Sequence, residues 1–209
     1  MYTLYGFPGT RSLRVVWALE EMGLPYEYKV VNLLKGEHRE AAYKALTPTS
    51  KVPLLVGHGL SMTESSAILC QLADTHGYQE FIPAVATPER ASFEQAMFFL
   101  ATELEQPLWS MVKHSFALPE AYRLAGMKDC GTYEYQHALE VFANTLGDNE
   151  FVVGNMFTVA DILAGHTLMW AREAGQELLH DNVRNYCARL EARDAFAAAK
   201  RCEDSYKPG

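Results

Sequence analysis

The chain has 209 residues, of which 49% are hydrophobic and 21% charged, and this composition is typical of a folded globular protein rather than a disordered one. Its 18 Lys and Arg residues against 26 Asp and Glu residues give a formal net charge of −8. That negative charge argues against electrostatic binding of nucleic acid or anionic lipid over the whole surface, so an anionic ligand would need a local basic pocket.

The cysteine pattern and the hydropathy exclude further classes of protein. The four cysteines form no C-x-x-C pair, and they are Cys70, Cys130, Cys187 and Cys202. This spacing argues against a disulfide scaffold, a metal site or a dithiol redox centre. No apolar run approaches the ~18 residues of a membrane span, and the first residues read as a strand rather than a signal peptide. We therefore expect a cytoplasmic protein with no membrane or nucleic-acid partner.

The first eighty residues alternate strand and helix signals in the order βαβαββα. The expected strands lie at 2–5, 26–31, 52–56 and 60–62. Apolar residues at helical spacing and polar segments between turn residues predict helices at 11–22, 37–46 and 63–72. With a right-handed crossover between the first two strands, this order predicts a small mixed sheet covered by helices.

Beyond residue 80 the sequence changes character. Pro83 and the following Pro88 mark 81–87 as a linker, and the later segments have a helical period. Helices are expected at 88–116, 119–147, 158–174 and 179–191, with a short Ala-rich segment ending near 200. Residues 1–80 hold 7 Lys and Arg against 8 Asp and Glu, so nearly all the acidity lies in the helical half. The predicted organisation is an α/β domain over 1–80, a linker, and an all-helical domain over 88–209.

Two loops of the first domain lie where helix N-termini are expected. The segment 7–12 offers the hydroxyls of Thr10 and Ser12 at the start of the first helix, with Thr10 as the expected N-cap residue. Glu64 and Ser65 open the third helix, where unpaired N–H groups favour a bound carboxylate, although a serine there also serves as a simple cap.

A proline follows Val52 at the start of the third expected strand. A cis bond to Pro53 would leave the amide and carbonyl of Val52 free to pair with an extended peptide. Most X-Pro bonds are trans, and the residues alone favour an edge-strand proline in the trans form.

Four segments resemble, in their order and spacing, those of the cytosolic glutathione S-transferases. They read YGFPGTRSLRV, GEHREAAYKALTPTSKVPLL, TESSAI and GNMFTVADI, and the resemblance covers essentially the whole chain. It implies a thioredoxin-like N-terminal domain that binds glutathione and an all-α C-terminal domain. It also implies a homodimer and, as the second substrate, a small hydrophobic electrophile.

The same resemblance implies a set of glutathione contacts. Pro53 would be cis, and the backbone of Val52 would pair with the cysteinyl part of the tripeptide. Glu64 and Ser65 match the residues that hold the γ-glutamyl end. The remaining expected contacts are Arg11, His38, Arg39 and Lys51. His38 and Arg39 stand where plant phi enzymes carry a His-Lys pair near the glycine carboxylate, and these cations would supply the local basic pocket.

The residue that activates the glutathione thiol is left open by the resemblance. The position that carries serine in many phi and tau enzymes is Gly9 here, whereas the theta-like serine position falls on Thr10. Ser12 is a further candidate, and we rank Thr10 ahead of it. Arg11 or a neighbour replaces the cysteine found in beta and omega enzymes, which disfavours deglutathionylation by that route.

In the helical half, Thr158 and Asp161 have the spacing of a capping box, so we expect Asp161 to serve folding rather than catalysis. The leading hypothesis is a glutathione transferase that directs the glutathione thiolate at an apolar electrophile. Two alternatives stay open, namely glutathione-dependent peroxide or disulfide reduction, and a transferase-fold interaction protein that has lost chemistry.

Overall fold

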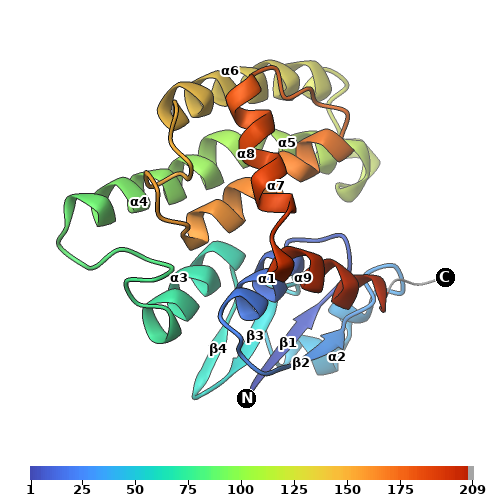
Figure 1. Ribbon diagram of the computed structural model, residues 1–209. Coiled ribbons are helices and arrows are strands. Elements are labelled where there is room, and N and C mark those ends of the chain that lie inside the picture. The colour runs from blue at the N-terminus through green and yellow to red at the C-terminus, as the bar shows by residue number, and fades with distance from the viewer. Residues whose placement is uncertain (207–209) are drawn as a thin grey trace. The chain divides into compact units, whose positions relative to one another are not determined.

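The computed structural model describes residues 1–206, which form two compact units (Figure 1). The first unit comprises Met1–Ile82 and the chain from Glu191 onward, and the second comprises Pro83–Leu190. Each unit buries its own apolar side chains, such as Trp17 in the first and Leu108 in the second. Among the described residues, no helix is both long enough and apolar enough to cross a bilayer.

A four-stranded sheet forms the centre of the first unit, with the strand order β2-β1-β3-β4. The strands are β1 Tyr2–Gly6, β2 Tyr26–Val30, β3 Leu54–Gly57 and β4 Leu60–Met62. β1 pairs in parallel with β2 and antiparallel with β3, which in turn pairs antiparallel with β4. This mixed sheet, with its crossover helix after β1, confirms the thioredoxin-like class.

The helices of the first unit begin with α1 Ser12–Glu21 and α3 Ser65–His76, close to the expected bounds. The polar helix expected at 37–46 is instead a 3₁₀ turn, η1 Glu37–Arg39, followed by the short α2 Ala41–Lys44. Glu40 separates them because its backbone is extended, with φ −71° and ψ 152°. Of these two short helices, the buried residue is Tyr43, so tertiary burial does not favour a continuous helix.

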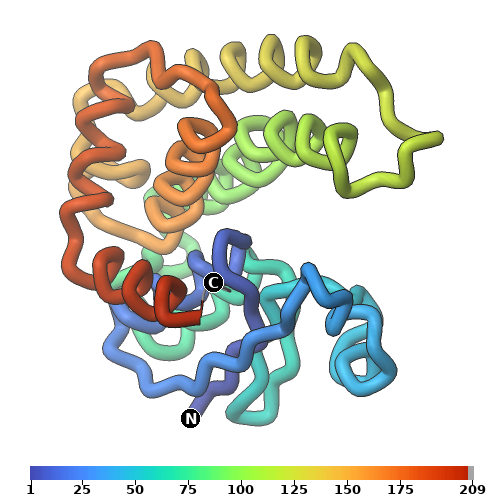
Figure 2. Tube along the Cα trace, turned by 90° about the vertical axis from the view of Figure 1, so that its right-hand side faces the viewer, coloured from blue at the N-terminus to red at the C-terminus, as the bar shows by residue number. Residues whose placement is uncertain are grey.

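The last helix, α9 Asp194–Asp204, packs against α1 in the first unit. The ring centroid of Phe196 lies 4.8 Å from that of Trp17, and Arg193 makes a bidentate ion pair with Glu21. Figures 1 and 2 show α9, in red, beside the first-unit elements. The prediction assigned all of 88–209 to the helical domain, and the structure corrects this assignment because a helical period does not reveal which surface a helix covers.

The second unit is helical, as predicted. Its α-helices are α4 Pro88–Phe99, α5 Glu105–Val112, α6 Met127–Leu146, α7 Val159–Glu173 and α8 Asp181–Glu191. The single helix expected at 88–116 is interrupted by a π-helical segment at Leu100–Leu104, and a second one, Lys113–Ala117, follows α5. The first interruption precedes Pro107, which has no N–H to continue the regular ladder.

The predicted helix over 119–147 is shorter than expected at its start. A 3₁₀ turn, η4 Glu120–Tyr122, comes first, and α6 begins at Met127. Leu118 and Arg123 on either side of the turn have extended backbones, so the helix cannot run through them.

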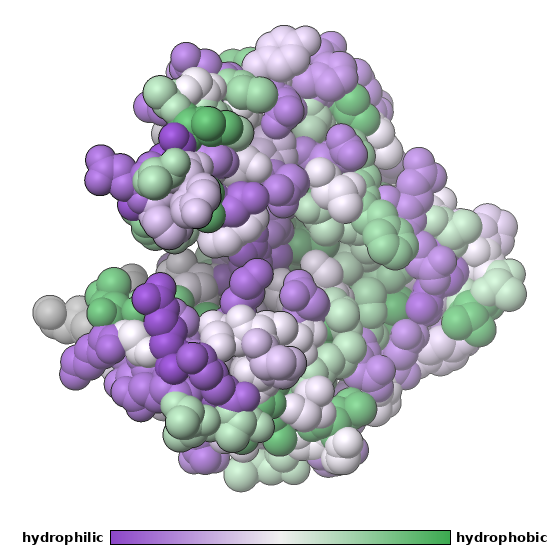
Figure 3. Space-filling model, turned by 180° about the vertical axis from the view of Figure 1, so that it is seen from behind, coloured by the Kyte–Doolittle hydropathy of each residue, from purple (hydrophilic) through white to green (hydrophobic). Residues whose placement is uncertain are grey.

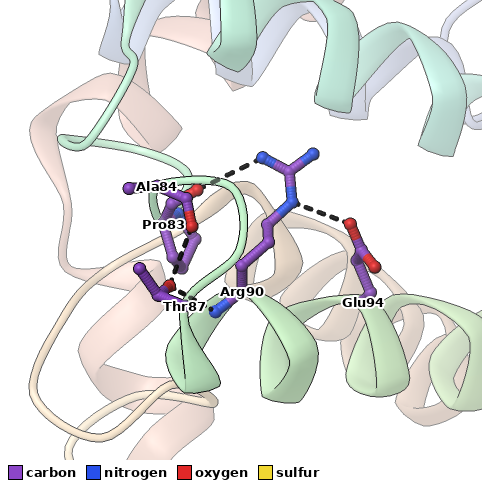
Figure 4. A network of polar contacts seen from close by, with 5 residues as sticks. All are labelled: Pro83, Ala84, Thr87, Arg90 and Glu94. Atoms are coloured by element: carbon purple, nitrogen blue, oxygen red, sulfur yellow. Dashed lines mark hydrogen bonds and ion pairs between the residues drawn. The ribbon is translucent and has the colours of Figure 1, made fainter.

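The predicted linker leads into the N-terminus of α4 through a polar network (Figure 4). The Thr87 hydroxyl accepts a hydrogen bond from the Arg90 amide at 3.1 Å and donates one to the Ala84 carbonyl at 2.8 Å. The Arg90 guanidinium donates to the Pro83 carbonyl and pairs with Glu94. Thr87 therefore caps α4, and these contacts fold the chain from Pro83 onward onto the helix.

Some apolar side chains remain on the surface of the second unit. Phe98, Phe116, Tyr122 and Leu124 are each more than 60% exposed. Figure 3 shows hydrophobic and hydrophilic residues interspersed on one face of the molecule. Scattered exposed apolar residues are normal for a folded protein and need no partner to explain them.

The start of α7 is held by the predicted capping box. Asp161 Oδ2 accepts hydrogen bonds from the Thr158 amide at 2.7 Å and the Thr158 hydroxyl at 3.1 Å. Asp161 Oδ1 accepts from the Val152 amide at 2.9 Å and the Tyr186 hydroxyl at 2.8 Å. Asp161 is fully buried, so one carboxylate joins the start of α7, the preceding turn and α8. These contacts give Asp161 the structural role that the sequence predicted.

We predict that Asp161→Ala lowers the free energy of unfolding by roughly 3 kcal/mol. The substitution removes the acceptor of several buried hydrogen-bond donors, and each donor costs about 1–3 kcal/mol when it is unpaired. Urea denaturation measures the loss. Asp148→Ala, at an exposed aspartate near the end of α6, is the matched control and should change the stability by no more than about 0.5 kcal/mol. Equal losses in the two variants would contradict the role given to Asp161.

Candidate functional site

The sheet topology brings three separate loops to one edge. β1 ends where β3 begins, because the strands are antiparallel and Tyr5 lies opposite Leu54. β4 ends at the same edge, since Met62 lies opposite Leu55. The loops at 7–11, 51–53 and 63–64 therefore meet at this edge, together with the N-termini of α1 and α3. This edge carries most of the residues that the sequence singled out.

The loop after β1 is held by its two hydroxyl groups. The Thr10 hydroxyl lies 2.7 Å from the Phe7 carbonyl and 2.9 Å from the Ser12 Oγ, either of which can accept its single proton. Thr10 Oγ1 in turn accepts from the Ser12 amide at 3.2 Å, and Ser12 Oγ accepts from the Phe7 amide at 3.3 Å. These hydrogen bonds hold the loop against the start of α1.

Burial distinguishes the two candidate hydroxyls. Ser12 is 0% exposed, whereas Thr10 is partly exposed. A ligand at this edge would therefore meet Thr10, with Ser12 behind it as a support. The expected N-cap role of Thr10 needs correction, because Arg11 occupies the N-cap position and makes no side-chain capping bond.

Two glycines allow this loop to take its path. A Cβ on Gly6 would lie 2.7 Å from the Tyr28 hydroxyl oxygen and 2.9 Å from Ser12 Cβ, so no larger residue fits without movement. Gly9 has φ +74°, in the left-handed region that glycine adopts without steric cost. The left-handed backbone at Gly9 thus favours glycine at this position.

At the start of α3, a buried arginine contacts the serine. Arg14 Nη1 donates a hydrogen bond of 3.2 Å to Ser65 Oγ, and both residues are buried. Because the guanidinium occupies an acceptor position on Ser65 Oγ, the Ser65 hydroxyl proton can point elsewhere. Glu64 is exposed and has φ +65°, an uncommon backbone conformation for a residue with a side chain. Strain of this kind is often found at binding sites.

Arg14 is a site residue that the sequence reading missed. Its bond to Ser65 joins residues 51 positions apart, and no local pattern predicts such a contact. The available signal was its position inside the apolar stretch that predicted α1.

The third loop presents the backbone around Val52. The Val52–Pro53 bond is cis, as the resemblance implied and contrary to the trans form favoured by the residues alone. The Tyr43 hydroxyl donates a 2.7 Å hydrogen bond to the Lys51 carbonyl. Burial, with a smaller contribution from Tyr5, raises the pKa of Tyr43 to about 12, so the phenol keeps its proton at neutral pH. Tyr43 is a second contact that the sequence reading did not foresee.

The candidate cations differ in exposure and charge. Arg39 and Lys51 are exposed, and Arg11 is partly exposed. Arg39 Nε donates to His38 Nε2 at 3.1 Å. Burial, followed by the charges of Arg39 and Lys44, lowers the pKa of His38. His38 is therefore neutral at pH 7, and the cations among these candidates are arginine and lysine.

In the part of the chain that the structure describes, no cluster of three or more His, Cys, Asp or Glu side chains could hold a metal ion. The four cysteines are free thiols. The sheet edge thus offers hydroxyls, backbone amides, two helix N-termini and the cationic side chains of Arg11 and Lys51, which suit a carboxylate-bearing ligand.

Comparison with known proteins identifies the family. Residues 1–74 match the glutathione S-transferase N-terminal domain, and residues 106–194 match the C-terminal domain. Glutathione S-transferase 2 of Anopheles gambiae is 30% identical over 84% of this chain and 82% of its own length. The chain therefore belongs to the glutathione S-transferase family.

Solved structures agree with this assignment. A glutathione transferase from Methylococcus capsulatus has a TM-score of 0.86 and 26% identity, covering 98% of this chain and 100% of its own. A family member from Pseudomonas fluorescens, solved with two glutathione molecules bound, has a TM-score of 0.82 and 26% identity, covering 95% and 92%.

We predict that Arg14→Met lowers the free energy of unfolding by roughly 2 kcal/mol, because a hydrogen bond to a charged group contributes about 1.5–3 kcal/mol. Urea denaturation gives the value, and methionine keeps much of the apolar bulk. Arg201→Met is the matched control, at an exposed arginine of the same unit, and should leave the stability nearly unchanged. A wild-type stability in Arg14→Met would show that the contact with Ser65 is dispensable.

Proposed function

We propose that this protein is a glutathione transferase that activates the glutathione thiol for attack on a small hydrophobic electrophile. The observation that carries the proposal is the partly exposed Thr10 hydroxyl at the α1 N-terminus, on the same sheet edge as Val52 and Ser65. The relatives named glutathione S-transferase and the neighbour that holds glutathione support it. On family grounds, we extend the proposal to a cytoplasmic homodimer with a role in detoxification.

In this proposal, the three loops bind different parts of the tripeptide. The Ser65 hydroxyl and the amides at the start of α3 hold the γ-glutamyl carboxylate, with Glu64 facing its ammonium group. The Val52 backbone pairs with the cysteinyl residue across the strand edge. Three cationic side chains hold the glycine carboxylate and the adjacent parts of glutathione, and they are Arg11, Arg39 and Lys51. His38 adds a neutral ring, and Pro53 shapes the Val52 turn.

The Thr10 hydroxyl turns its proton from the Phe7 carbonyl to the glutathione sulfur. A free thiol with a pKa near ~8.5 is about 3% thiolate at pH 7, and lowering the pKa by ~2 units requires ~2.7 kcal/mol. A hydroxyl bond to an anion contributes about 1.5–3 kcal/mol, and the helix dipole adds roughly 0.3–1 kcal/mol. These two effects are therefore large enough.

In the reaction, the thiolate sulfur forms a bond to the electrophilic carbon. The leaving group departs with the electron pair of the bond that breaks, and the thiol proton passes to solvent. The protein forms no covalent intermediate, and Ser12 acts by holding Thr10 through the hydrogen bonds of the loop.

We predict that Thr10→Ala lowers kcat for chlorodinitrobenzene by about 10-fold at pH 7, because less of the bound thiol is ionised. The rate of this variant should rise at a higher pH than that of the wild type, since the bound thiol then has a higher pKa. Thr10→Ser keeps the hydroxyl and should stay near wild-type activity. Thr75→Ala, on the exposed side of α3, is the control and should have no effect.

Two results would overturn this assignment. Wild-type rates in both Thr10→Ala and Ser12→Ala would show that neither hydroxyl activates the thiol. The absence of glutathione binding by calorimetry at millimolar ligand would favour the interaction-protein alternative.

The second candidate function is glutathione-dependent reduction of a disulfide or peroxide. The two glutathione molecules in the Pseudomonas fluorescens structure favour it, because two thiols are what such a reduction consumes. The first thiolate attacks a sulfur or peroxide oxygen and expels a thiolate or alkoxide. The expelled group takes up a proton, and the first glutathione is left as a mixed disulfide or a sulfenic acid. The thiolate of a second glutathione attacks the sulfur of the first to form oxidised glutathione, and a thiol or water leaves.

We expect conjugation of chlorodinitrobenzene to exceed turnover of cumene hydroperoxide and of a glutathione mixed disulfide. Parallel assays of one preparation, each at saturating glutathione, make the comparison. Reduction without measurable conjugation would replace the leading proposal with the second one.

A further inference from the structure

The last turn of α9 reaches the loop that carries Thr10. Glu203 Oε2 accepts a hydrogen bond of 3.2 Å from the backbone amide of Gly9, a residue 194 positions earlier in the chain. Glu203 is only 1% exposed, whereas Gly9 is exposed. An interior carboxylate from the end of the chain therefore binds the backbone of an otherwise surface loop.

The rest of α9 holds Glu203 in place. Phe196 packs on Trp17, and Arg193 pairs with Glu21 near the other end of the helix. Ala199 is fully buried between these contacts and Glu203. Because burying a carboxylate is costly without hydrogen bonds, the Gly9 amide is one of the groups that stabilise Glu203 inside the fold.

The bond acts at a glycine of the loop. Glycine has the greatest backbone freedom, and Gly9 adopts φ +74° directly before Thr10. The Gly9 N–H belongs to the Pro8–Gly9 peptide, so its bond to Glu203 fixes the peptide plane from which the φ and ψ of Gly9 lead to Thr10. The position of the Thr10 hydroxyl therefore depends on this bond. The hydroxyl bonds to Phe7 and Ser12 restrict the loop from the other side.

We propose that Glu203 is a positioning residue that holds the Gly9–Thr10 backbone so that the Thr10 hydroxyl faces the glutathione sulfur. This inference rests on the proposed function, since it requires Thr10 to activate the thiol. Glu203 acts as a hydrogen-bond acceptor, and its negative charge is not what helps: a nearby anion by itself disfavours a thiolate. The acceptor and the charge can therefore be separated by substitution.

The test compares Glu203→Ala with Glu203→Gln. The alanine variant loses the acceptor, so we expect kcat for chlorodinitrobenzene to fall by about 10-fold while the Kd for glutathione, measured by calorimetry, stays within about 2-fold. The ultraviolet absorbance of enzyme-bound thiolate should fall with kcat. The glutamine variant keeps an acceptor oxygen and loses the charge, so its kcat should remain near the wild-type value. A merely structural role would not separate kcat from Kd in this way.

Ser205→Ala is the matched control, because its exposed hydroxyl donates to the Cys202 carbonyl on the same turn and should leave kcat unchanged. A wild-type kcat in Glu203→Ala, or an equal loss in both Glu203 variants, would overturn the inference. If Glu203→Ala does not fold, amide hydrogen exchange in the wild-type protein decides: a Gly9 amide without protection would also overturn it.

Failure of this inference is distinguishable from failure of the proposed function. A protein that does not bind glutathione, or whose Thr10→Ala variant has wild-type rates, defeats the proposed function. A protein that conjugates and depends on Thr10, but is indifferent to Glu203→Ala, defeats the inference alone.

Discussion

The antiparallel pairing of β3 with both β1 and β4 is the constraint on which the candidate site depends. It places the end of β1, the start of β3 and the end of β4 at one edge, so three loops distant in sequence become neighbours. The helices that follow β1 and β4 then begin at this edge and direct their unpaired N–H groups there. The site is thus a consequence of strand order before any particular side chain is considered.

Buried polar contacts then set the geometry of the loops. Each of three contacts joins a donor to an acceptor on another segment, and in each at least one partner is buried: Arg14 to Ser65, Tyr43 to the Lys51 carbonyl, and the Gly9 amide to Glu203. A buried polar group without a partner costs free energy, so such contacts favour one arrangement over its competitors. Apolar packing holds the helices and strands together, and these hydrogen bonds fix the positions of the loops relative to the sheet.

Local patterns predicted most of the architecture. Apolar and aromatic runs bounded by turn residues located the four strands, and apolar spacing located α1, α3 and most of the second unit. The Thr158-x-x-Asp161 spacing predicted the capping box, because its hydrogen bonds join residues three positions apart. The candidate ligand residues came from a resemblance in motif order, and Thr10, Ser12, Val52 and Ser65 all lie at or beside the sheet edge described above.

By itself, the sequence determined the order of elements, the two-part organisation, the acidity of the helical half and the motif residues, because each depends on neighbours within a few positions. Tertiary structure decided the rest. The partner of α9, the contact of Arg14 with Ser65 and the bond from Gly9 to Glu203 each join residues far apart in the chain. No local pattern encodes such a contact, since the free energy that selects it comes from burying both partners together.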